Sequence, residues 1–374
     1  MSTYATENRG FILNMGPQHP STHGVLRLEV ECDGEVVSVA KPDIGYLHRC
    51  KEKVAEGEVY AKFTPYTDRI DYIAAMNQNL GYSIAVERLL GAEVPERAEY
   101  IRIIVAEMNR IASHLLAFGT YGLDVGAITP FLYAFREREQ VLDIFEHICG
   151  ARLTYAYVCI GGVMRDITGE QLGMIADFLD YFEPKLVEYD RLLSYNHIFI
   201  KRTANLGVIS PEMAIAYGCT GPMLRGSGVN WDLRRDEPYS IYDRFDWDVV
   251  VGKGEVGTVG DTWDRYIVRL REMRESVKIV RQAMEQVPKG PFQAKLPNRL
   301  KPKHGEVYFR SETPRGELGF YIVADGTTMP WRCKVRSPSF SNLCVIEDLT
   351  KGMMLADLVA VLGSTDIVMG DVDR

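Results

Sequence analysis

The sequence predicts an α+β fold in which a central helical bundle is flanked by β elements at both ends of the chain. Two observations lead to this prediction. Apolar residues alternate with charged ones near both ends of the 374-residue chain, and they recur at helical spacing through its middle. The content of 46% hydrophobic and 25% charged residues is ordinary for a globular protein with a large core. We expect an N-terminal β domain over 1–45, a helical core over 46–290, and a C-terminal region over 291–374 with a β hairpin, a helix and a buried tail.

The N-terminal β domain is predicted from alternation at the strand period. The apolar members of this pattern are Leu26, Leu28, Val30 and Cys32. Asp33-Gly34 then favours a hairpin turn into a second strand over 35–40, because both residues tolerate the left-handed backbone of such turns. These strands predict a small sheet.

Four long helices are predicted in the core, each from a signal at its N-terminus. They are a helix after Pro95, one from Thr129-Pro130 to about Gly150, one behind a Thr168/Gln171 capping box that Pro184 should kink, and one from Asp261. The apolar face of the first is Ile101, Ile104, Val105, Met108, Ile111 and Leu115. That of the last is Ile267, Leu270, Met273, Val277, Val280 and Met284. These stripes predict helices packed against one another.

Strand patterns return after a Pro-rich and Lys-rich segment that runs from Pro288 to His304. The predicted elements are strands over 306–312, 317–324 and 331–336, one helix over 347–362, and a tail over 366–374. Pro314-Arg315-Gly316 and Asp325-Gly326 are the expected turns.

Charge and cysteine content exclude several classes of function. A net charge of −8 leaves no basic stripe for nucleic acid, which we exclude as a partner. Seven scattered cysteines without a C-x-x-C pair predict neither a disulfide framework nor an iron-sulfur or zinc site, so we expect no metal in this chain. No secretory signal and no apolar run of about 18 residues are present, which predicts a peripheral protein on the cytoplasmic side.

Three candidate groups for proton chemistry stand out. His19 and His23 lie in GPQHPSTHG, where Pro and Gly prevent a helix; they are either proton donors at a cavity or loop residues satisfied by backbone. Asp124 lies in an apolar, Gly-rich segment without a nearby base, as a proton-handling carboxylate or as a helix-terminal cap. Tyr72, in TDRIDY, is either a hydrogen-bond donor to a ligand carbonyl or a core aromatic.

Several segments together resemble one family. They are GPQHPSTHG from residue 16, IGYLHR from 44, PYTDRIDY from 65, LDVGAITPF from 123, GPMLRGSG from 221 and WDLR from 231. SETPRGELGFYIVADG from 311 and the final 21 residues extend the match over essentially the whole chain. They resemble the quinone-site D subunit of complex I, which is the H-type subunit of plants and cyanobacteria and is related to nickel-iron hydrogenase large subunits.

The resemblance implies a hydrogenase-large-subunit-like fold. It also implies that the chain is a subunit of a proton-translocating oxidoreductase, which passes electrons from NADH or another donor to a quinone. That quinone would be menaquinone or ubiquinone. The chain alone would be inactive. It would form the quinone site with the iron-sulfur B subunit, which holds a 4Fe-4S cluster, and would contact the C and I subunits and the membrane-embedded H subunit. The complex would lie at the cytoplasmic face of the cell inner membrane.

Site residues are implied position by position. His23 and Tyr72 match the family's histidine and tyrosine at the two quinone oxygens, and Asp124 matches the carboxylate that pairs with that histidine. Arg49 in GYLHR matches an arginine beside the partner's cluster, and we place His19 and Arg49 around the site as supporting residues. A proton donor at each oxygen would neutralise the charge of a reduced quinone.

The hydrogenase relation also explains the expected absence of metal. The four positions that correspond to cysteine ligands are Asp71, Ala74, Val368 and Asp371. Val and Ala do not bind a soft metal, which argues against the main alternative, a catalytic hydrogenase large subunit. A scaffold without quinone chemistry is the other alternative.

Two positions depart from the family pattern. A histidine and an arginine that lie near the partner's cluster in the family are Thr154 and Cys159 here. Losing a titratable group and a cation predicts a cluster with a lower and less pH-dependent potential, which would suit menaquinone better than ubiquinone.

Overall fold

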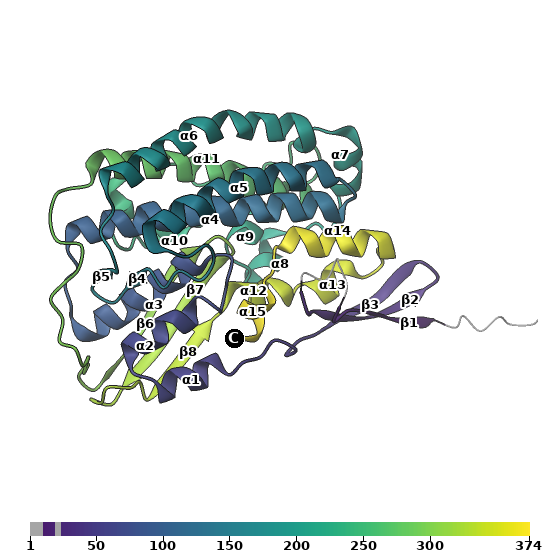
Figure 1. Ribbon diagram of the computed structural model, residues 1–374. Helices are drawn as coiled ribbons and strands as arrows, with labels where there is room; N and C mark the ends of the chain where they lie inside the picture. The colour runs from purple at the N-terminus through teal and green to yellow at the C-terminus, as the bar shows by residue number, and fades with distance from the viewer. Residues whose placement is uncertain (1–9, 19–23) are drawn as a thin grey trace, which may run out of the picture.

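The computed structural model describes residues 10–18 and 24–374, and it confirms the α+β class: helices stack in one layer above a small sheet, and a second sheet projects to one side (Figure 1). The candidate residues His19 and His23 lie outside the described residues. No helix in the described part of the chain combines the length and the apolar character needed to cross a membrane.

The projecting sheet is antiparallel, with strand order β1-β2-β3. Its strands are β1 (Phe11–Met15), β2 (Arg27–Asp33) and β3 (Val36–Asp43). The alternation in the sequence is realised here, because Leu28, Val30 and Cys32 are buried while their neighbours face outward. The second predicted strand extends three residues beyond Ala40, to Asp43.

The four predicted helices are present. They are α4 (Glu96–Asp124), α5 (Ile128–Cys149), α6 (Gly169–Tyr189) and α11 (Thr262–Gln286). The N-terminal signals act as expected: Thr168 and Gln171 form the capping box of α6, and the Asp261 side chain accepts a hydrogen bond from the backbone N–H of Asp264. A further helix, α3 (Ala75–Leu90), packs between this bundle and the C-terminal sheet.

The C-terminal sheet consists of β6 (Gly305–Thr313), β7 (Gly316–Ala324) and β8 (Arg332–Arg336), all antiparallel. The two-residue turn Pro314-Arg315 between β6 and β7 requires a positive φ of 128° at Gly316, which lies against Thr220. This turn carries Arg315 into the interior.

The single helix predicted over 347–362 is wrong. The chain instead forms α13 (Ile346–Thr350) and α14 (Leu355–Thr365), separated at Gly352, whose φ is 80°. The segment between them pairs with β3, because the N–H of Val37 donates to the Met353 carbonyl at 2.8 Å and the N–H of Gly352 donates to the Val37 carbonyl at 2.7 Å. These non-local hydrogen bonds outweigh the helical pattern of the sequence.

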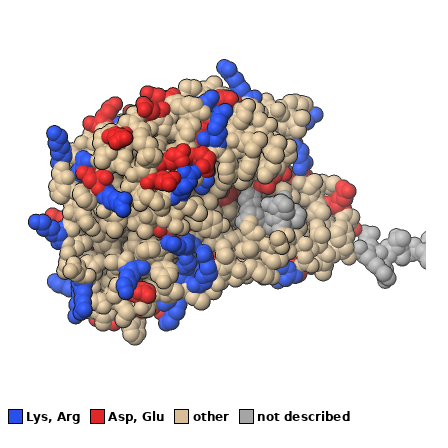
Figure 2. Space-filling model, viewed as in Figure 1, with Lys and Arg blue, Asp and Glu red and all other residues tan. Residues whose placement is uncertain are grey.

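Shorter elements connect the layers. They are α1 (Lys51–Gly57), α2 (Tyr60–Thr67), β4 (Val158–Cys159), β5 (Gly162–Val163), the π-helical turn η2 (Asp190–Ser194), α7 (His197–Thr203), α8 (Pro211–Ala216), α9 (Pro222–Gly226), α10 (Leu233–Asp236), η3 (Tyr242–Arg244), α12 (Pro338–Leu343) and α15 (Met369–Asp373). On the face drawn in Figure 2, acidic side chains gather over the upper helices and no continuous basic stripe is visible.

Candidate functional site

Tyr72 follows α2 in a short irregular segment before α3. The ring is half-buried and lies against the C-terminal segment: a methyl group added at Gly370 would come within 3.1 Å of the Tyr72 ring and 2.7 Å of the Ile70 carbonyl oxygen. Burial raises the pKa of the Tyr72 phenol, and the neighbouring Asp71 raises it further, while Arg315 and Arg49 lower it. Tyr72 therefore lies in a field of fixed charges.

The charges behind Tyr72 converge on Arg315, which is buried. Its guanidinium donates to Asp71 Oδ2 at 2.8 Å, to Ser113 Oγ at 3.0 Å, and to the carboxylate and carbonyl of Asp366 at 3.2 and 2.9 Å. Asp71 also accepts hydrogen bonds from the backbone N–H groups of Ile73 and Ala74, at the start of α3. Burial, opposed by Arg315, raises the pKa of Asp71 to about 6.

The structure brings together Asp71 and Asp371, two of the four positions that the resemblance matches to cysteine ligands of hydrogenases. Asp71 and Asp371 are both buried, and the negative charge of Asp371 contributes to the raised pKa of Asp71. Asp371 Oδ2 accepts from the backbone N–H of Ser339 at 3.1 Å. Within residues 10–18 and 24–374, no group of three or more His, Cys, Asp or Glu side chains is arranged to hold a metal ion.

Asp124 is the last residue of α4 and is half-buried. Its carboxylate lies over α14, since a methyl group added at Gly363 would be 2.6 Å from Asp124 Oδ2. Tyr72 and Asp124 therefore border the same C-terminal segment, Tyr72 at Gly370 and Asp124 at Gly363. The predicted pairing of Asp124 with His23 cannot be followed, because His23 lies outside the described residues.

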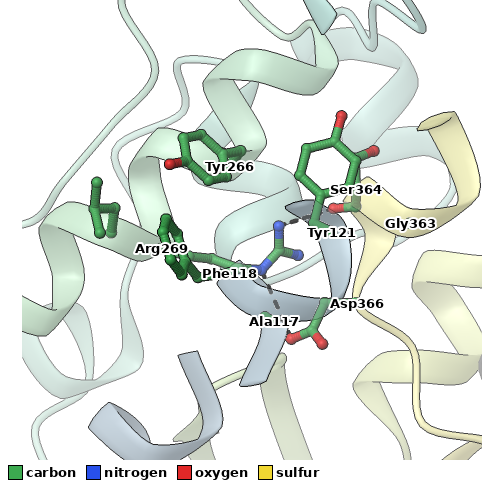
Figure 3. Close-up of a pocket in the computed structure, with 9 residues that line it drawn as sticks. Ala117, Phe118, Tyr121, Tyr266, Arg269, Gly363, Ser364 and Asp366 are labelled. Carbon is green, nitrogen blue, oxygen red and sulfur yellow. Dashed lines mark hydrogen bonds and ion pairs between the residues drawn. The ribbon is translucent and has the colours of Figure 1, made fainter. Parts of the chain in front are cut away.

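A small cavity lies beside the end of α14 (Figure 3). Its wall includes Tyr121 from α4, Arg269 from α11, and Gly363 and Asp366 at the end of α14. Arg269 donates to the carbonyl of Ser364 at 2.8 Å and to that of Thr365 at 3.2 Å, so a cation caps the C-terminus of α14. The same Arg269 lies 3.7 Å from the Asp366 carboxylate.

Arg49 is exposed and its backbone is tied to the end of the chain. Its guanidinium donates to the Arg69 carbonyl at 2.7 Å, and its N–H donates to the Arg374 carbonyl at 3.3 Å. Asp373 fixes the preceding loop by accepting hydrogen bonds from the N–H groups of Gly45 and Leu47 at 2.8 and 2.7 Å. Arg49 thus lies on the surface close to the segment that carries Tyr72.

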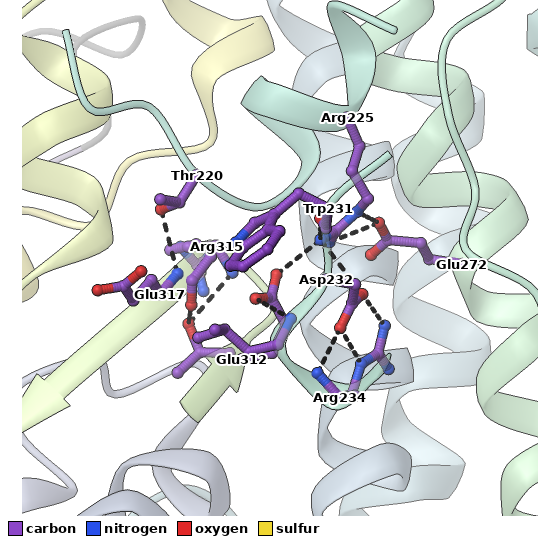
Figure 4. A network of polar contacts seen from close by, with 12 residues as sticks. Thr220, Arg225, Trp231, Asp232, Arg234, Glu272, Glu312, Arg315 and Glu317 are labelled. Atoms are coloured by element: carbon purple, nitrogen blue, oxygen red, sulfur yellow. Dashed lines mark hydrogen bonds and ion pairs between the residues drawn. The ribbon is translucent and has the colours of Figure 1, made fainter. Parts of the chain in front are cut away.

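A buried ionic network underlies the site (Figure 4). Arg225 of α9 pairs with Glu272 of α11 and Glu312 of β6, each at 2.8 Å, and also with Asp232 at 3.2 Å. Arg234 extends the network to Glu107 of α4 at 3.2 Å. These ion pairs connect the bundle with β6, whose turn carries Arg315.

Sequence reasoning missed Arg315 and Asp366 as parts of the site. The sequence predicts only a turn at Arg315 and a tail at Asp366. Arg315 is 244 positions from Asp71 and 51 from Asp366, and no local pattern indicates that these residues meet in the folded chain. The one available signal is the segment SETPRGELG, which carries part of the resemblance but indicates no role for its arginine.

Comparison with known proteins gives a family match. The family described as respiratory-chain NADH dehydrogenase, 49 Kd subunit, matches residues 124–304 and 295–374. The D subunit of the NADH-quinone oxidoreductase of Chlorobium luteolum is 54% identical over 374 residues, 99% of this chain and 94% of the relative.

Two further relatives agree. The D subunit of the same enzyme in Chlorobaculum tepidum is 54% identical over 97% of this chain and 92% of its own. The protein numbered D 2 in Anaeromyxobacter dehalogenans is 54% identical over 98% of this chain and 97% of its own. Each of these proteins carries the name NADH-quinone oxidoreductase and is matched over nearly its full length.

Proposed function

Because this chain belongs to the family of the 49 kDa subunit of respiratory-chain NADH dehydrogenase, we propose that it is the D subunit of an NADH-quinone oxidoreductase and forms part of the quinone-reduction site. The enzyme is the multisubunit complex, and the chain has no activity by itself. The observation that carries the proposed site is the position of Tyr72, half-buried between the C-terminal segment and the charges of Asp71 and Arg315.

In the proposed reaction, two electrons reach the quinone from the partner's 4Fe-4S cluster and two protons come from this chain. The Tyr72 hydroxyl donates a proton to one quinone oxygen, and His23 donates to the other. Asp124 orients or recharges the histidine. Because the dianion that a quinone forms on taking two electrons without protons is strongly disfavoured outside water, losing either donor leaves negative charge without a stabilising partner.

The assembly follows from the same proposal. The iron-sulfur B subunit, the C and I subunits, and the membrane-embedded H subunit are the expected neighbours, with Arg49 facing the cluster of the B subunit and His19 supporting His23. The chain associates with the cytoplasmic face of the inner membrane through these neighbours and couples the site to proton translocation. Menaquinone or ubiquinone is the substrate.

Quinone reductase activity of the assembled complex tests the site. Tyr72→Phe removes only the hydroxyl, so we expect assembly to persist and kcat to fall by about 10²-fold or more, the range for loss of a positioned proton donor. His23→Ala is expected to act similarly. Tyr195→Phe is the matched control, because Tyr195 is 50% exposed beyond the end of η2.

Full activity in assembled Tyr72→Phe would instead favour the scaffold alternative. The hydrogenase alternative is tested by nickel analysis of the purified complex, in which stoichiometric nickel would contradict the proposal. These two measurements separate the three functions considered from the sequence.

A further inference from the structure

Arg315 joins three segments that lie far apart in the sequence. Its guanidinium contacts Asp71 before α3, Ser113 in α4, and Asp366 after α14, at distances of 2.8 to 3.2 Å. The arginine itself is held by its neighbours, because Asn342 donates to the Arg315 carbonyl at 3.1 Å and the backbone turns tightly at Gly316. The cation is therefore fixed in position as well as buried.

Two of these segments shape the surroundings of Tyr72. Asp71 directly precedes Tyr72, and the segment after Asp366 includes Gly370, on which the Tyr72 ring rests. One guanidinium thus ties the loop that carries the phenol to the surface that supports its ring. Arg315 also lies beside Asp371, a buried carboxylate of the C-terminal segment, so its charge faces carboxylates from both of these segments.

We propose that Arg315 is a positioning residue for Tyr72, which holds the phenol in place and makes it a stronger proton donor toward the reduced quinone. The inference rests on the proposed function and deepens it. No contact between Arg315 and the quinone is required, because the cation acts through Asp71 and through its field at the phenol.

The charges around the phenol agree with this role. Asp71 opposes ionisation of Tyr72, and Arg315 and Arg49 favour it. Around Arg315 itself lie the carboxylates of Asp71, Asp366 and Asp371. Because Arg315 is paired with several carboxylates its pKa is well above the ordinary value, and the cation persists at every working pH.

The test combines Arg315 variants with a change of phenol acidity in the assembled complex. In Arg315→Gln the phenol becomes a weaker acid, so we expect kcat to fall by about tenfold or more while KM changes little. Replacing Tyr72 by 3-fluorotyrosine, a more acidic phenol, should restore at least about threefold of that loss, yet should change the parent complex little. Arg315→Lys, which keeps the charge, should lose less than Arg315→Gln.

Arg225→Gln is the matched control, since Arg225 is an equally buried arginine whose carboxylate partners are Glu272 and Glu312 rather than the Asp71 that precedes Tyr72 (Figure 4). We expect this variant to lower the amount of assembled complex without a specific response to 3-fluorotyrosine. An unchanged kcat in Arg315→Gln overturns the proposal. So does a loss that 3-fluorotyrosine does not reverse, because that loss is then structural.

If Arg315→Gln does not assemble, the proposal is tested with Asp71→Asn. The amide oxygen of asparagine can still accept the hydrogen bonds from the backbone N–H groups of Ile73 and Ala74, so this variant should fold. Removing this charge strengthens the phenol as an acid, so fluorination should then reduce kcat or leave it unchanged. An increase of kcat on fluorination of Asp71→Asn overturns the proposal. Failure of the quinone site itself is distinguished by Tyr72→Phe, which in that case retains activity while Arg315 is intact.

Discussion

Gly363, which has no side chain, leaves room for the Asp124 carboxylate of the proposed site. The residue lies in the last part of α14, where alanine would ordinarily be favoured over glycine by about 1 kcal/mol. An added methyl group, however, would be 2.6 Å from Asp124 Oδ2 and 3.0 Å from the Tyr121 ring. The close approach of α4 and α14 at this point therefore requires glycine, and it fixes the Asp124 carboxylate.

Gly363→Ala accordingly tests whether the position of Asp124 matters for the reaction. We predict an assembled complex whose quinone reductase activity falls by roughly tenfold, because a displacement of about 1 Å at a catalytic group can cost 10- to 100-fold. Gly173→Ala in α6 is the control: nothing lies within 4 Å of the added methyl group, and stability should rise by about 0.5–1 kcal/mol without loss of activity. Full activity of Gly363→Ala would show that Asp124 serves only as the end of α4.

At the scale of single residues, the sequence indicates candidates that lie in a distinctive motif. It does not indicate residues whose partners come close only in the folded chain. Tyr72 and Asp124 are candidates because they lie in distinctive segments, and the structure puts both against the C-terminal segment. Arg315 is not predictable as a site residue, because its importance arises from Asp71 and Asp366, which approach it only in the folded chain.

Among the elements, α4 buries several charged side chains. Most of its residues are buried, and they include Glu107, Arg110 and His114. Glu107 is paired with Arg110 and Arg234 and accepts hydrogen bonds from the hydroxyls of Tyr242 and Ser276. Burial opposes ionisation of Glu107, but the two arginines prevail and lower its pKa to about 2.

This shift predicts how stability depends on pH. Because the folded-state pKa of Glu107 is below its ordinary value of 4.5, its contribution is fully present above about pH 4.5 and is lost as pH falls toward 2. Glu107→Gln removes the negative charge that pairs with the buried Arg110 and Arg234. We expect it to lower the free energy of unfolding by about 3–5 kcal/mol at pH 7. Hydrogen exchange of the α4 amides in the complex should show this difference shrinking below about pH 4.5.

An exposed glutamate supplies the comparison for that measurement. Glu139 in α5 is about half exposed. Glu139→Gln should therefore change the opening free energy obtained from hydrogen exchange of the α4 amides by less than about 1 kcal/mol at any pH. A Glu107→Gln effect that stayed constant from pH 7 to pH 3 would contradict the assignment of the shift to Glu107.

Element boundaries are predictable where local chemistry decides them. The capping box at Thr168 and the cap at Asp261 indicate the starts of α6 and α11, because both act within one helical turn. The break between α13 and α14 is not predictable in this way. There, hydrogen bonds between β3 and residues 352 and 353 stabilise a bend that the apolar pattern of 347–362 does not indicate.

At the scale of the whole molecule, the C-terminal segment contacts all the described parts of the proposed site. The segment from Gly363 to Arg374 contacts Asp124, Arg315, Tyr72 and the loop that carries Arg49. The resemblance to hydrogenase large subunits matches positions in both the Tyr72 segment and this tail to cysteine ligands, and the structure places the two segments in contact. Composition and periodicity alone predict the layers but not this contact, which joins segments about 300 residues apart.

The last prediction concerns the assembled complex, in which the expected electron donor to the quinone is the iron-sulfur cluster of the partner subunit. The resemblance places a histidine at position 154, where this chain has the half-buried Thr154, and the nearby Arg152 is engaged with the acidic residues Glu139, Asp143 and Glu146 of α5. Cys159, where the resemblance places an arginine, lines an open pocket of about 650 Å³. Neither position supplies a group that changes charge near pH 7 or a free cation toward a partner.

A redox titration of the partner's cluster in the assembled complex should therefore give a midpoint potential with a slope well below the roughly 59 mV per pH unit of a fully proton-coupled one-electron step. Thr154→His restores a group that titrates near neutral pH and should steepen the slope toward that limit. Leu153→His adds the same group one residue away, at an exposed position, and should leave the slope unchanged. A steep slope in the unmodified complex would contradict the prediction, because the proton that accompanies reduction would then bind at a site other than position 154.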